Sequence, residues 1–511
     1  MDSVRIEIDG SNLTLEKFIK IARNGELVKI ADPAVARINQ ARGFVDTAVE
    51  EERVIYGLTT GFGKFSDVSI SKEDAKTLQR NLILSHACGV GKALSEEVSR
   101  GVMLLRANAL AKGNSGIRLS TVSTLIDMLN KGVHPIIPEK GSLGSSGDLA
   151  PLSHMVLVMI GEGEAIYKGE RMPGREAMER ANIKIVELTS KEGLALINGT
   201  QVMTSIGAFV VYDAIKLSKY ADLIASMTVE AMNGITDAYD PRVHEVRNQS
   251  GQMDAADNLL RILKDSNNTS CQGEIRVQDS YTLRCIPQVH GASKDAIEYV
   301  RDKVEKEMNA ATDNPLIFPG DGDAISGGNF HGQPMALAFD FLGIALSEYA
   351  NISERRLEKL VNPALSEGLP AFLAECGGLN SGFMIIQYSA ASLVSENKVL
   401  AHPASVDSIP SSANQEDHVS MGTIAARKAT EILFNARNVL GMELLTACQA
   451  LDLRGNKGLG QGTKILYDNF RKKVEYRSND KAFQADILES EKMLKNYDLL
   501  DEIEEKIGLL K

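Results

Sequence analysis

The sequence predicts a mainly α-helical protein organised around a long central helix bundle. Strand-like segments are few and short, whereas long, mostly apolar stretches with helical periodicity occupy roughly 200–232, 333–362, 383–402 and 421–450. A helix that is apolar on most of its sides is usually buried, and several such helices favour a bundle. The sequence contains no repeats, low-complexity tracts or Pro/Gly-rich linkers, which indicates one compact body.

Shorter helices are expected in the first part of the chain. Ser71, followed by the acidic Glu73 and Asp74, predicts the capped start of an amphipathic helix. The stretch 95–112 begins with a serine, repeats the amphipathic pattern and is followed by Gly113. A glycine directly after a periodic segment is a typical helix stop, so this stretch predicts a second helix.

The remaining elements are small strands and a polar tail. Segments 165–170 and 183–186 predict a small β excursion in the N-terminal part, and Gly234 ends the long helix that begins near residue 200. From residue 480 onward, charged and apolar residues alternate as they do in surface helices. We therefore expect an N-terminal region at 1–200, a central helical bundle at 201–450 and C-terminal surface helices at 451–511.

Composition and charge exclude several classes of partner. Of the 511 residues, 43% are hydrophobic, which is ample for a sizeable core. The net charge of −12 argues against nucleic acid or an anionic membrane, because both require a basic face. The N-terminus has no apolar segment of the kind found in signal peptides. The least charged long window, 376–395, is interrupted by polar residues and is not expected to span a bilayer.

Cysteine and histidine usage predicts a cytoplasmic protein without a metal site. The five cysteines are an odd number with no CxxC spacing, which favours free thiols in a reducing compartment. The eight histidines are scattered and form no HxH or HExxH motif. We expect neither a structural nor a catalytic metal ion.

The most distinctive segment is the loop Gly141–Leu152, with the sequence GSLGSSGDLAPL. In a tight loop the amide nitrogen of Gly147 can attack the carbonyl of Ser145, and Ser146 can then lose water. Two dehydrations leave an imidazolone ring with an exocyclic methylene, which is a strong electrophile. Glycine is needed at the attacking position because a residue without Cβ lets its nitrogen approach a carbonyl two residues back.

The same loop has more ordinary interpretations. It can be a turn that precedes a helix, with Asp148 as the N-cap, or an anion-binding loop at a helix N-terminus. Ser146 is followed at once by Gly147, so the segment does not match a nucleophile elbow. It also lacks the Gly-Lys-Ser/Thr of a P-loop.

Seven further blocks occur in a characteristic order between residue 56 and residue 422. They are Tyr56–Gly63, Ser85-His86, Asn198–Gln201, Gln278–Cys285, Thr312–Pro315, Gly328–Gly332 and Asn414–His418. Together with the Ser-Ser-Gly loop, they resemble the aromatic amino acid ammonia-lyase and aminomutase family. The resemblance covers most of the chain.

The resemblance implies a fold, an assembly and an electrophile. Members of this family have a fumarase/aspartase-like helical fold and form homotetramers, in which several chains contribute to each active site. Their electrophile is 4-methylidene-imidazole-5-one (MIO), which here would form from Ser145, Ser146 and Gly147 without an external cofactor. Ser145 is a departure, since alanine is most common at that position. Cyclisation uses only the carbonyl of this residue, so we expect the ring to form.

The resemblance also implies roles for two tyrosines. Removal of ammonia from an α-amino acid needs a base for the β-proton, and Tyr56 is the candidate. A phenol needs a lowered pKa for this role, which a nearby cation or hydrogen-bond donor can supply. Without the family context, Tyr56 is more simply a packing anchor. Tyr281 is expected to orient the electrophile or to assist proton transfer.

Other residues are expected to bind the substrate. Arg284 suits the substrate carboxylate, which a guanidinium binds through two parallel hydrogen bonds, although an interface salt bridge is an equal alternative. Asn198 can donate to the same carboxylate or to the imidazolone oxygen. Gln278 and Phe330 are expected to line the pocket, and Asn314 is either a turn residue or a ligand.

His86 and Glu416 point to the substrate. A carboxylate opposite the substrate ring can hold an imidazole N–H but is costly against a phenyl ring, and phenylalanine-type relatives lack both residues. We therefore expect L-histidine to be converted to trans-urocanate and ammonia. Two alternatives are a tyrosine or phenylalanine ammonia-lyase or 2,3-aminomutase with the same electrophile, and a non-catalytic helical scaffold with an uncyclised loop.

Overall fold

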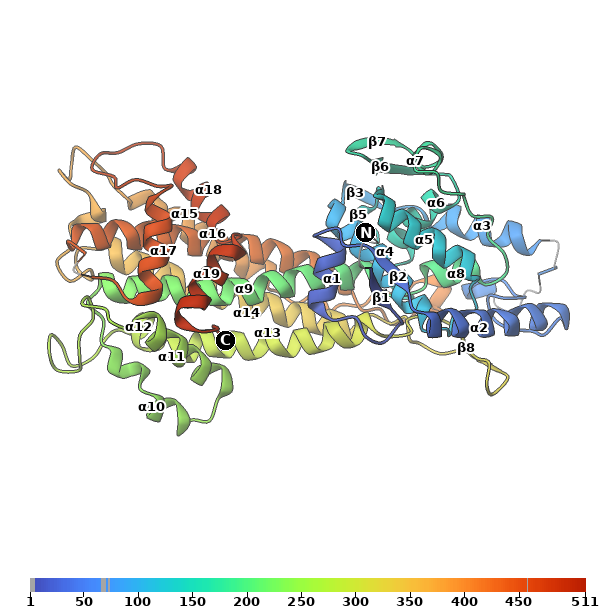
Figure 1. The fold of residues 1–511 in the computed structure, drawn as a ribbon, viewed down its shortest axis with the longest axis horizontal. Coiled ribbons are helices and arrows are strands. Elements are labelled where there is room, and N and C mark those ends of the chain that lie inside the picture. The colour runs from blue at the N-terminus through green and yellow to red at the C-terminus, as the bar shows by residue number, and fades with distance from the viewer. Residues whose placement is uncertain (1–4, 66–69, 72–73, 457) are drawn as a thin grey trace. The chain divides into compact units, whose positions relative to one another are not determined.

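The computed structural model describes residues 5–65, 70–71, 74–456 and 458–511 (Figure 1). The chain divides into two compact units, each assembled from three separate stretches. The first unit comprises Met1–Phe209, Arg301–Asp340 and Pro403–Arg427, and the second comprises Val210–Val300, Phe341–His402 and Lys428–Lys511. The three sequence regions 1–200, 201–450 and 451–511 stay a prediction.

Long helices dominate the structure and confirm the predicted fold class. They include α9 (Gln201–Ala231), α13 (Ile286–Met308), α14 (Gln333–Val361), α15 (Met384–Leu400) and α16 (Gly422–Leu453). Four of them match the apolar stretches found in the sequence to within a few residues.

The parts of α9, α13, α14 and α16 that belong to the second unit pack as a bundle that encloses polar side chains. Arg356 of α14 forms a fully buried ion pair with Glu443 of α16, with 2.6 Å between Nε and Oε1. His290 of α13 bonds to Asp222 of α9 at 2.7 Å through Nδ1. Nη1 of Arg356 also lies 3.4 Å from Nε2 of His290, so polar contacts connect all four helices. The shorter helices of this unit are α10 (Pro241–Glu245), α11 (Ser250–Ile262), α12 (Tyr281–Arg284), α17 (Gln461–Arg471), α18 (Gln484–Met493) and α19 (Tyr497–Ile507).

The first unit has its core around helix α4 (Glu96–Ala111), in which 102–105 and 107 are almost fully buried. Ser95 caps this helix by accepting a hydrogen bond from the Val98 N–H, and Gly113 follows its end with a φ of +85°, as predicted. The other helices of this unit are α1 (Leu15–Ala22), α2 (Asp32–Glu50), α3 (Ala75–His86), α5 (Leu119–Lys131), α6 (Leu149–Met159), α7 (Gly174–Arg180) and α8 (Glu192–Ile197).

The predicted helix after Ser71 begins at Ala75, as α3. The Ser71 hydroxyl accepts a hydrogen bond from the Asp74 N–H at 3.1 Å, while Glu73 lies outside the described residues.

The strands of the first unit form small sheets. β1 (Ile6–Ile8) pairs with β2 (Val28–Ile30) in parallel, and the remaining pairs are antiparallel. These are β3 (Val90–Ala93) with β5 (Pro138–Lys140), β6 (Glu164–Tyr167) with both β4 (Val133–Pro135) and β7 (Glu170–Pro173), and β8 (Leu316–Phe318) with β9 (Asp323–Ile325).

The predicted strand at 183–186 is wrong. Residues 183–186 have no regular secondary structure. The partner of β6 is instead the segment that follows it directly, because Lys168 and Gly169 have positive φ angles of 52° and 80°. Two consecutive residues with positive φ make the tight turn that joins neighbouring antiparallel strands.

Helix α14 is long and apolar enough to cross a membrane, but 72% of its most apolar window is buried against the rest of the chain. Its composition is therefore explained by packing. All five cysteines are free thiols, as predicted.

Candidate active site

The Ser-Ser-Gly loop connects β5 to α6 in the first unit and contains two positions that only glycine fits. Gly144 and Gly147 have φ angles of +67° and +75°. A Cβ on Gly144 would lie 2.3 Å from Ser420 Oγ, and one on Gly147 would lie 2.2 Å from Gly199 O. The loop is therefore closely held by segments that come later in the chain.

Asp148 is the N-cap residue of α6 by position, but its side chain fixes the end of this loop through bonds to other segments. Its side chain makes no capping bond to α6. Oδ2 instead accepts hydrogen bonds at 2.9 Å from the N–H groups of Val202 and Met203, in the first turn of α9. Oδ1 accepts from the hydroxyls of Ser142 and Thr423. The expected cap is thus present on a different helix, and burial raises the pKa of Asp148 in spite of these donors.

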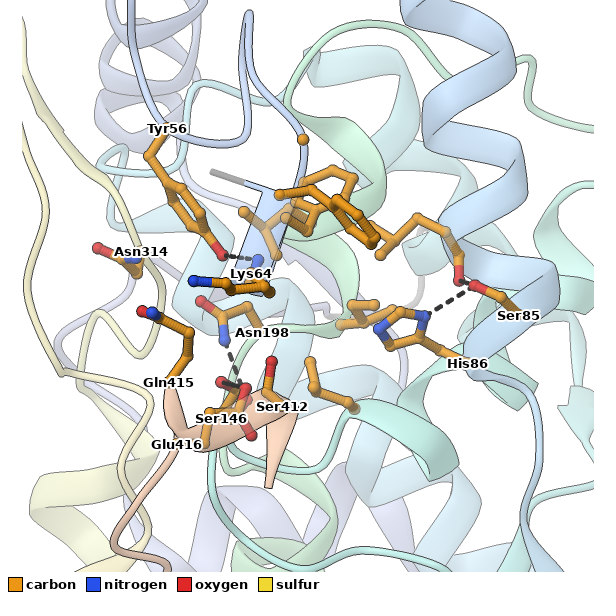
Figure 2. A pocket seen from close by; sticks show the side chains of 18 of the residues that line it. Tyr56, Lys64, Ser85, His86, Ser146, Asn198, Asn314, Ser412, Gln415 and Glu416 are labelled. Atoms are coloured by element: carbon orange, nitrogen blue, oxygen red, sulfur yellow. Dashed lines mark hydrogen bonds between the residues drawn. The ribbon is translucent and has the colours of Figure 1, made fainter. Parts of the chain in front are cut away.

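A cavity of about 1040 Å³ opens beside the loop and brings six of the predicted site residues together. Figure 2 shows this cavity, whose lining comes entirely from the first unit. The predicted residues in its wall are Tyr56, His86, Ser146, Asn198, Phe330 and Glu416.

Ser146 stands between two of these residues. Its hydroxyl donates to Oε1 of Glu416 at 2.8 Å, and its carbonyl oxygen accepts a hydrogen bond from Nδ2 of Asn198 at 2.9 Å (Figure 2). The second oxygen of Glu416 accepts from the Ser411 hydroxyl at 3.2 Å. Cyclisation would retain the Ser146 carbonyl as the ring carbonyl, so Asn198 already contacts that oxygen.

Tyr56 lies in the same wall, with its hydroxyl oxygen accepting a hydrogen bond from the Gly63 N–H at 3.1 Å. Burial raises the pKa of Tyr56, and the negative charge of Glu416 adds to this effect. The Gly63 N–H acts in the opposite direction without cancelling it. In this chain the phenol is therefore protonated at neutral pH.

His86 is the last residue of α3, and its Nδ1 lies 3.0 Å from the Ser85 hydroxyl. Burial lowers the pKa of His86, although Glu416 has a smaller opposing effect. The imidazole is neutral near pH 7 and can exchange hydrogen bonds with a polar ring in the cavity.

The remaining predicted residues lie elsewhere. Ser145 and Gly147 line a smaller cavity of about 230 Å³, together with His86 and Cys88. Gln278, Tyr281 and Arg284 belong to the second unit and do not line the main cavity.

Tyr281 has 70% of its surface exposed. The guanidinium of Arg284 stacks 4.7 Å from the centre of the Tyr281 ring, and its Nε donates to the Asp279 carbonyl. The two predicted residues are thus neighbours on the surface of one chain.

Among the polar residues that line the cavity, Lys64, Ser412 and Gln415 were not predicted from the sequence as site residues. Lys64 directly follows the block Tyr56–Gly63 and Gln415 lies within the block Asn414–His418, so their positions in the sequence were a usable signal, whereas nothing local distinguishes Ser412. Asn314 also lines the cavity, and its Oδ1 accepts hydrogen bonds from the Gly327 N–H and the Ser326 hydroxyl. It therefore holds a wall loop in place.

The described residues contain no group of three or more His, Cys, Asp or Glu side chains arranged to hold a metal ion. They do fit a ring made from the loop itself. Gly144 and Gly147 allow the tight turn, and the side-chain amide of Asn198 donates a hydrogen bond to the Ser146 oxygen that the ring would keep.

Comparisons with known proteins agree with this geometry. The family model described as aromatic amino acid lyase matches residues 13–472. A histidine ammonia-lyase from Alkaliphilus oremlandii is 66% identical over 505 residues, which cover 99% of each chain.

Solved structures give the same result. The crystal structure of histidine ammonia-lyase from Trypanosoma cruzi is 41% identical with a TM-score of 0.92, covering 99% of this chain and 96% of that one. The tyrosine aminomutase from Streptomyces globisporus is 36% identical with a TM-score of 0.96, covering 99% of this chain and 100% of that one.

Proposed function

The chain belongs to the aromatic amino acid lyase family, and from this membership we propose that it converts L-histidine to trans-urocanate and ammonia. It is an ammonia-lyase, as are the histidine ammonia-lyases that it matches over nearly its whole length. The observation that carries the choice of substrate is the position of Glu416, which lines the cavity with His86 and contacts Ser146.

The electrophile that we propose is MIO, formed from Ser145, Ser146 and Gly147. When formed, it supplies an electron-poor methylene that captures the substrate amine and makes it a better leaving group. Asn198 supports this assignment because its amide already donates to the Ser146 carbonyl. A preorganised donor at an oxygen where negative charge develops is a large contributor to catalysis.

Glu416 and His86 are proposed to recognise the imidazole ring of the substrate. The Glu416 carboxylate can accept the N–H of an imidazole, and the neutral His86 can serve as donor or acceptor. A phenyl ring offers no N–H, so a carboxylate facing it would lose hydration without compensation. The residues therefore favour histidine over phenylalanine.

Tyr56 is proposed as the base that removes the β-proton. Its raised pKa means that a cation must approach before it can act at neutral pH. Among the described residues that line the cavity, Lys64 is the one lysine or arginine, and Figure 2 shows it next to Tyr56 in that view.

We further propose a homotetramer in the cytoplasm, in which Gln278, Tyr281 and Arg284 enter the active site of another copy. Tyr281 is exposed and does not line the cavity of its own chain. Helix α15 also carries exposed apolar residues at helical spacing, namely Ile385, Tyr388 and Val399, with exposed fractions of 57%, 61% and 73%. A row of this kind suits an interface between copies. The free cysteines are compatible with a reducing compartment.

The test combines intact mass with absorbance. The purified chain should be two water molecules lighter than its encoded mass, and L-histidine should produce a rising near-ultraviolet signal with release of ammonia. The Ser146→Ala variant should lose both properties. An uncyclised but folded chain would favour the scaffold alternative, whereas a cyclised chain that uses only tyrosine or phenylalanine would contradict the choice of substrate.

A further inference from the structure

Arg106, in helix α4, is a fully buried arginine that contacts the segment beginning at Asn198. Its exposed fraction is 0%. Nη1 donates to the carbonyl oxygen of Asn198 at 3.0 Å, to Oε1 of Gln201 at 2.9 Å and to the carbonyl oxygen of Thr312 at 3.3 Å. Burial lowers the pKa of Arg106 to about 10, so the guanidinium is still charged at neutral pH.

The burial of this guanidinium lowers the stability of the folded state. Burying a charge costs free energy unless its hydrogen bonds are satisfied, and Nε and Nη2 of Arg106 have no partner among the described residues. An aliphatic side chain would fill the space without that cost. The position of Arg106 therefore calls for a role beyond packing.

One residue, Gly199, separates Arg106 from the Ser-Ser-Gly loop. A Cβ on Gly199 would lie 2.4 Å from Nη1 of Arg106, and a Cβ on Gly147 would lie 2.2 Å from Gly199 O. The same Gly199 oxygen accepts a hydrogen bond from the Asp148 N–H at 2.7 Å. Arg106, Gly199 and the loop are thus packed in direct succession.

Asn198 links this stack to the electrophile. Its side chain donates to the Ser146 carbonyl, while its own carbonyl accepts from Arg106. Gln201 braces the arrangement, because its Nε2 donates to the Thr312 hydroxyl at 2.6 Å. A single guanidinium therefore ties two separate segments, at Asn198 and at Thr312, and both adjoin residues that line the cavity.

We propose that Arg106 is a positioning residue for the electrophile: it holds the Asn198–Gly199 turn against the loop and so keeps the Asn198 amide on the Ser146 carbonyl oxygen. The inference rests on the proposed formation of the ring from this loop. It assigns to Arg106 an effect on the reactivity of the electrophile that does not depend on which amino acid is the substrate.

Borohydride tests the inference without a substrate. Its hydride adds to the methylene carbon and solvent supplies a proton, so the chain gains two hydrogen atoms, which intact mass records over time. In Arg106→Lys the electrophile should still form, but hydride addition should be slowed about 100-fold, since a small misplacement of a catalytic group has an effect of this size. With L-histidine, kcat should fall while KM changes little.

Arg100→Lys is the matched control. Arg100 lies on the same helix, and its guanidinium also binds three backbone carbonyls, those of Ile21, Ala22 and Leu129. None of these three residues lines the cavity. The control variant should lose a similar amount of stability as Arg106→Lys does. It should nevertheless react with borohydride at the same rate as the chain without substitutions.

A double-mutant cycle with Asn198→Ala shows whether Arg106 acts through Asn198. Asn198→Ala alone should slow hydride addition by about 100- to 1000-fold, as the loss of one oxyanion donor does. Adding Arg106→Lys to that variant should then cost little more, because the two residues act in series. If the factors by which the two substitutions slow hydride addition multiply, or if Arg106→Lys reacts at the normal rate, the inference is overturned.

Three further outcomes are informative. If Arg106→Lys does not fold, Gln201→Met removes one acceptor at similar volume and should produce a smaller slowing in the same direction; an unchanged rate in that variant would contradict the proposal. Loss of the mass deficit in Arg106→Lys but not in Arg100→Lys would contradict it, since Arg106 would then be needed for ring formation and not for the reactivity of the finished electrophile. If the chain without substitutions reacts with borohydride but not with L-histidine, the proposed substrate is refuted, whereas the inference about Arg106 is not affected.

Discussion

Replacing Glu416 with glutamine is the sharpest test of substrate recognition, because it removes the charge and keeps the shape. Glu416 accepts hydrogen bonds from Ser146 at 2.8 Å and from Ser411 at 3.2 Å. The Ser146 hydroxyl is lost when the proposed ring forms, so Ser411 is the remaining donor of these two, and a glutamine can still accept from it through its carbonyl oxygen. We therefore expect the cavity wall to stay in place and the electrophile to form.

The size of the effect follows from the contact that is lost. A hydrogen bond to a charged group contributes about 1.5–3 kcal/mol. Since about 1.4 kcal/mol corresponds to a factor of ten in rate, kcat/KM for L-histidine should fall by about 10- to 150-fold. Any residual activity with L-phenylalanine should be unchanged or higher, because a phenyl ring has no N–H for the carboxylate to accept.

The assay is the initial rate of product absorbance at several concentrations of each amino acid, with intact mass as a check on the electrophile. Asp417→Asn is the matched control, since Asp417 is exposed and does not line the cavity. A surface substitution of this kind should change kcat/KM by no more than about twofold. Equal losses with both amino acids, or no loss with L-histidine, would refute the assignment of Glu416 to the imidazole ring.

Three further predictions concern the loop and the base. Gly147→Ala should keep both water molecules and be inactive, because its Cβ would lie 2.2 Å from Gly199 O; a two-water deficit in the intact mass of this variant would contradict the geometry. Ser145→Ala should leave KM for L-histidine within about twofold, because Ser145 lines the smaller cavity and not the one that holds Glu416; steady-state kinetics checks this. Because the pKa of Tyr56 is raised, the fraction of phenolate grows as pH increases above neutral, so kcat should rise with pH in that range; a pH profile of Tyr56→Phe that keeps the same slope would assign the base to another group.

Local sequence signals were sufficient wherever the structure is locally determined. The long apolar stretches gave the bounds of α9, α14, α15 and α16 to within a few residues, because amphipathic and buried helices carry their periodicity in the chain itself. Ser95 and Gly113 marked the ends of α4 for the same reason.

Signals that depend on distant partners were missed or misplaced. Asp148 has the sequence position of an N-cap for α6, yet its carboxylate caps α9, more than fifty residues later. Segment 183–186 has strand-like composition but no partner, because β7 already occupies the edge of β6. Neither outcome is visible in the residues alone.

The candidate site shows the same division. Tyr56, His86, Asn198 and Glu416 were each found within a short block, and one chain gathers them around a single cavity. The role of Arg106 could not be predicted, because an arginine within an apolar helix gives no indication of the turn that it will contact.

The contacts that hold the Ser-Ser-Gly loop also bear on when the proposed ring could form during synthesis on a ribosome. Gly144 packs against Ser420, whose hydroxyl donates to its carbonyl, and Asp148 bonds to Thr423. A nascent chain that has grown only to residue 400 contains the whole loop but neither of these partners. Formation of the proposed ring would therefore have to wait for residues 420–423, and a truncated product would carry an uncyclised peptide in place of an electrophile that amines of other proteins could attack.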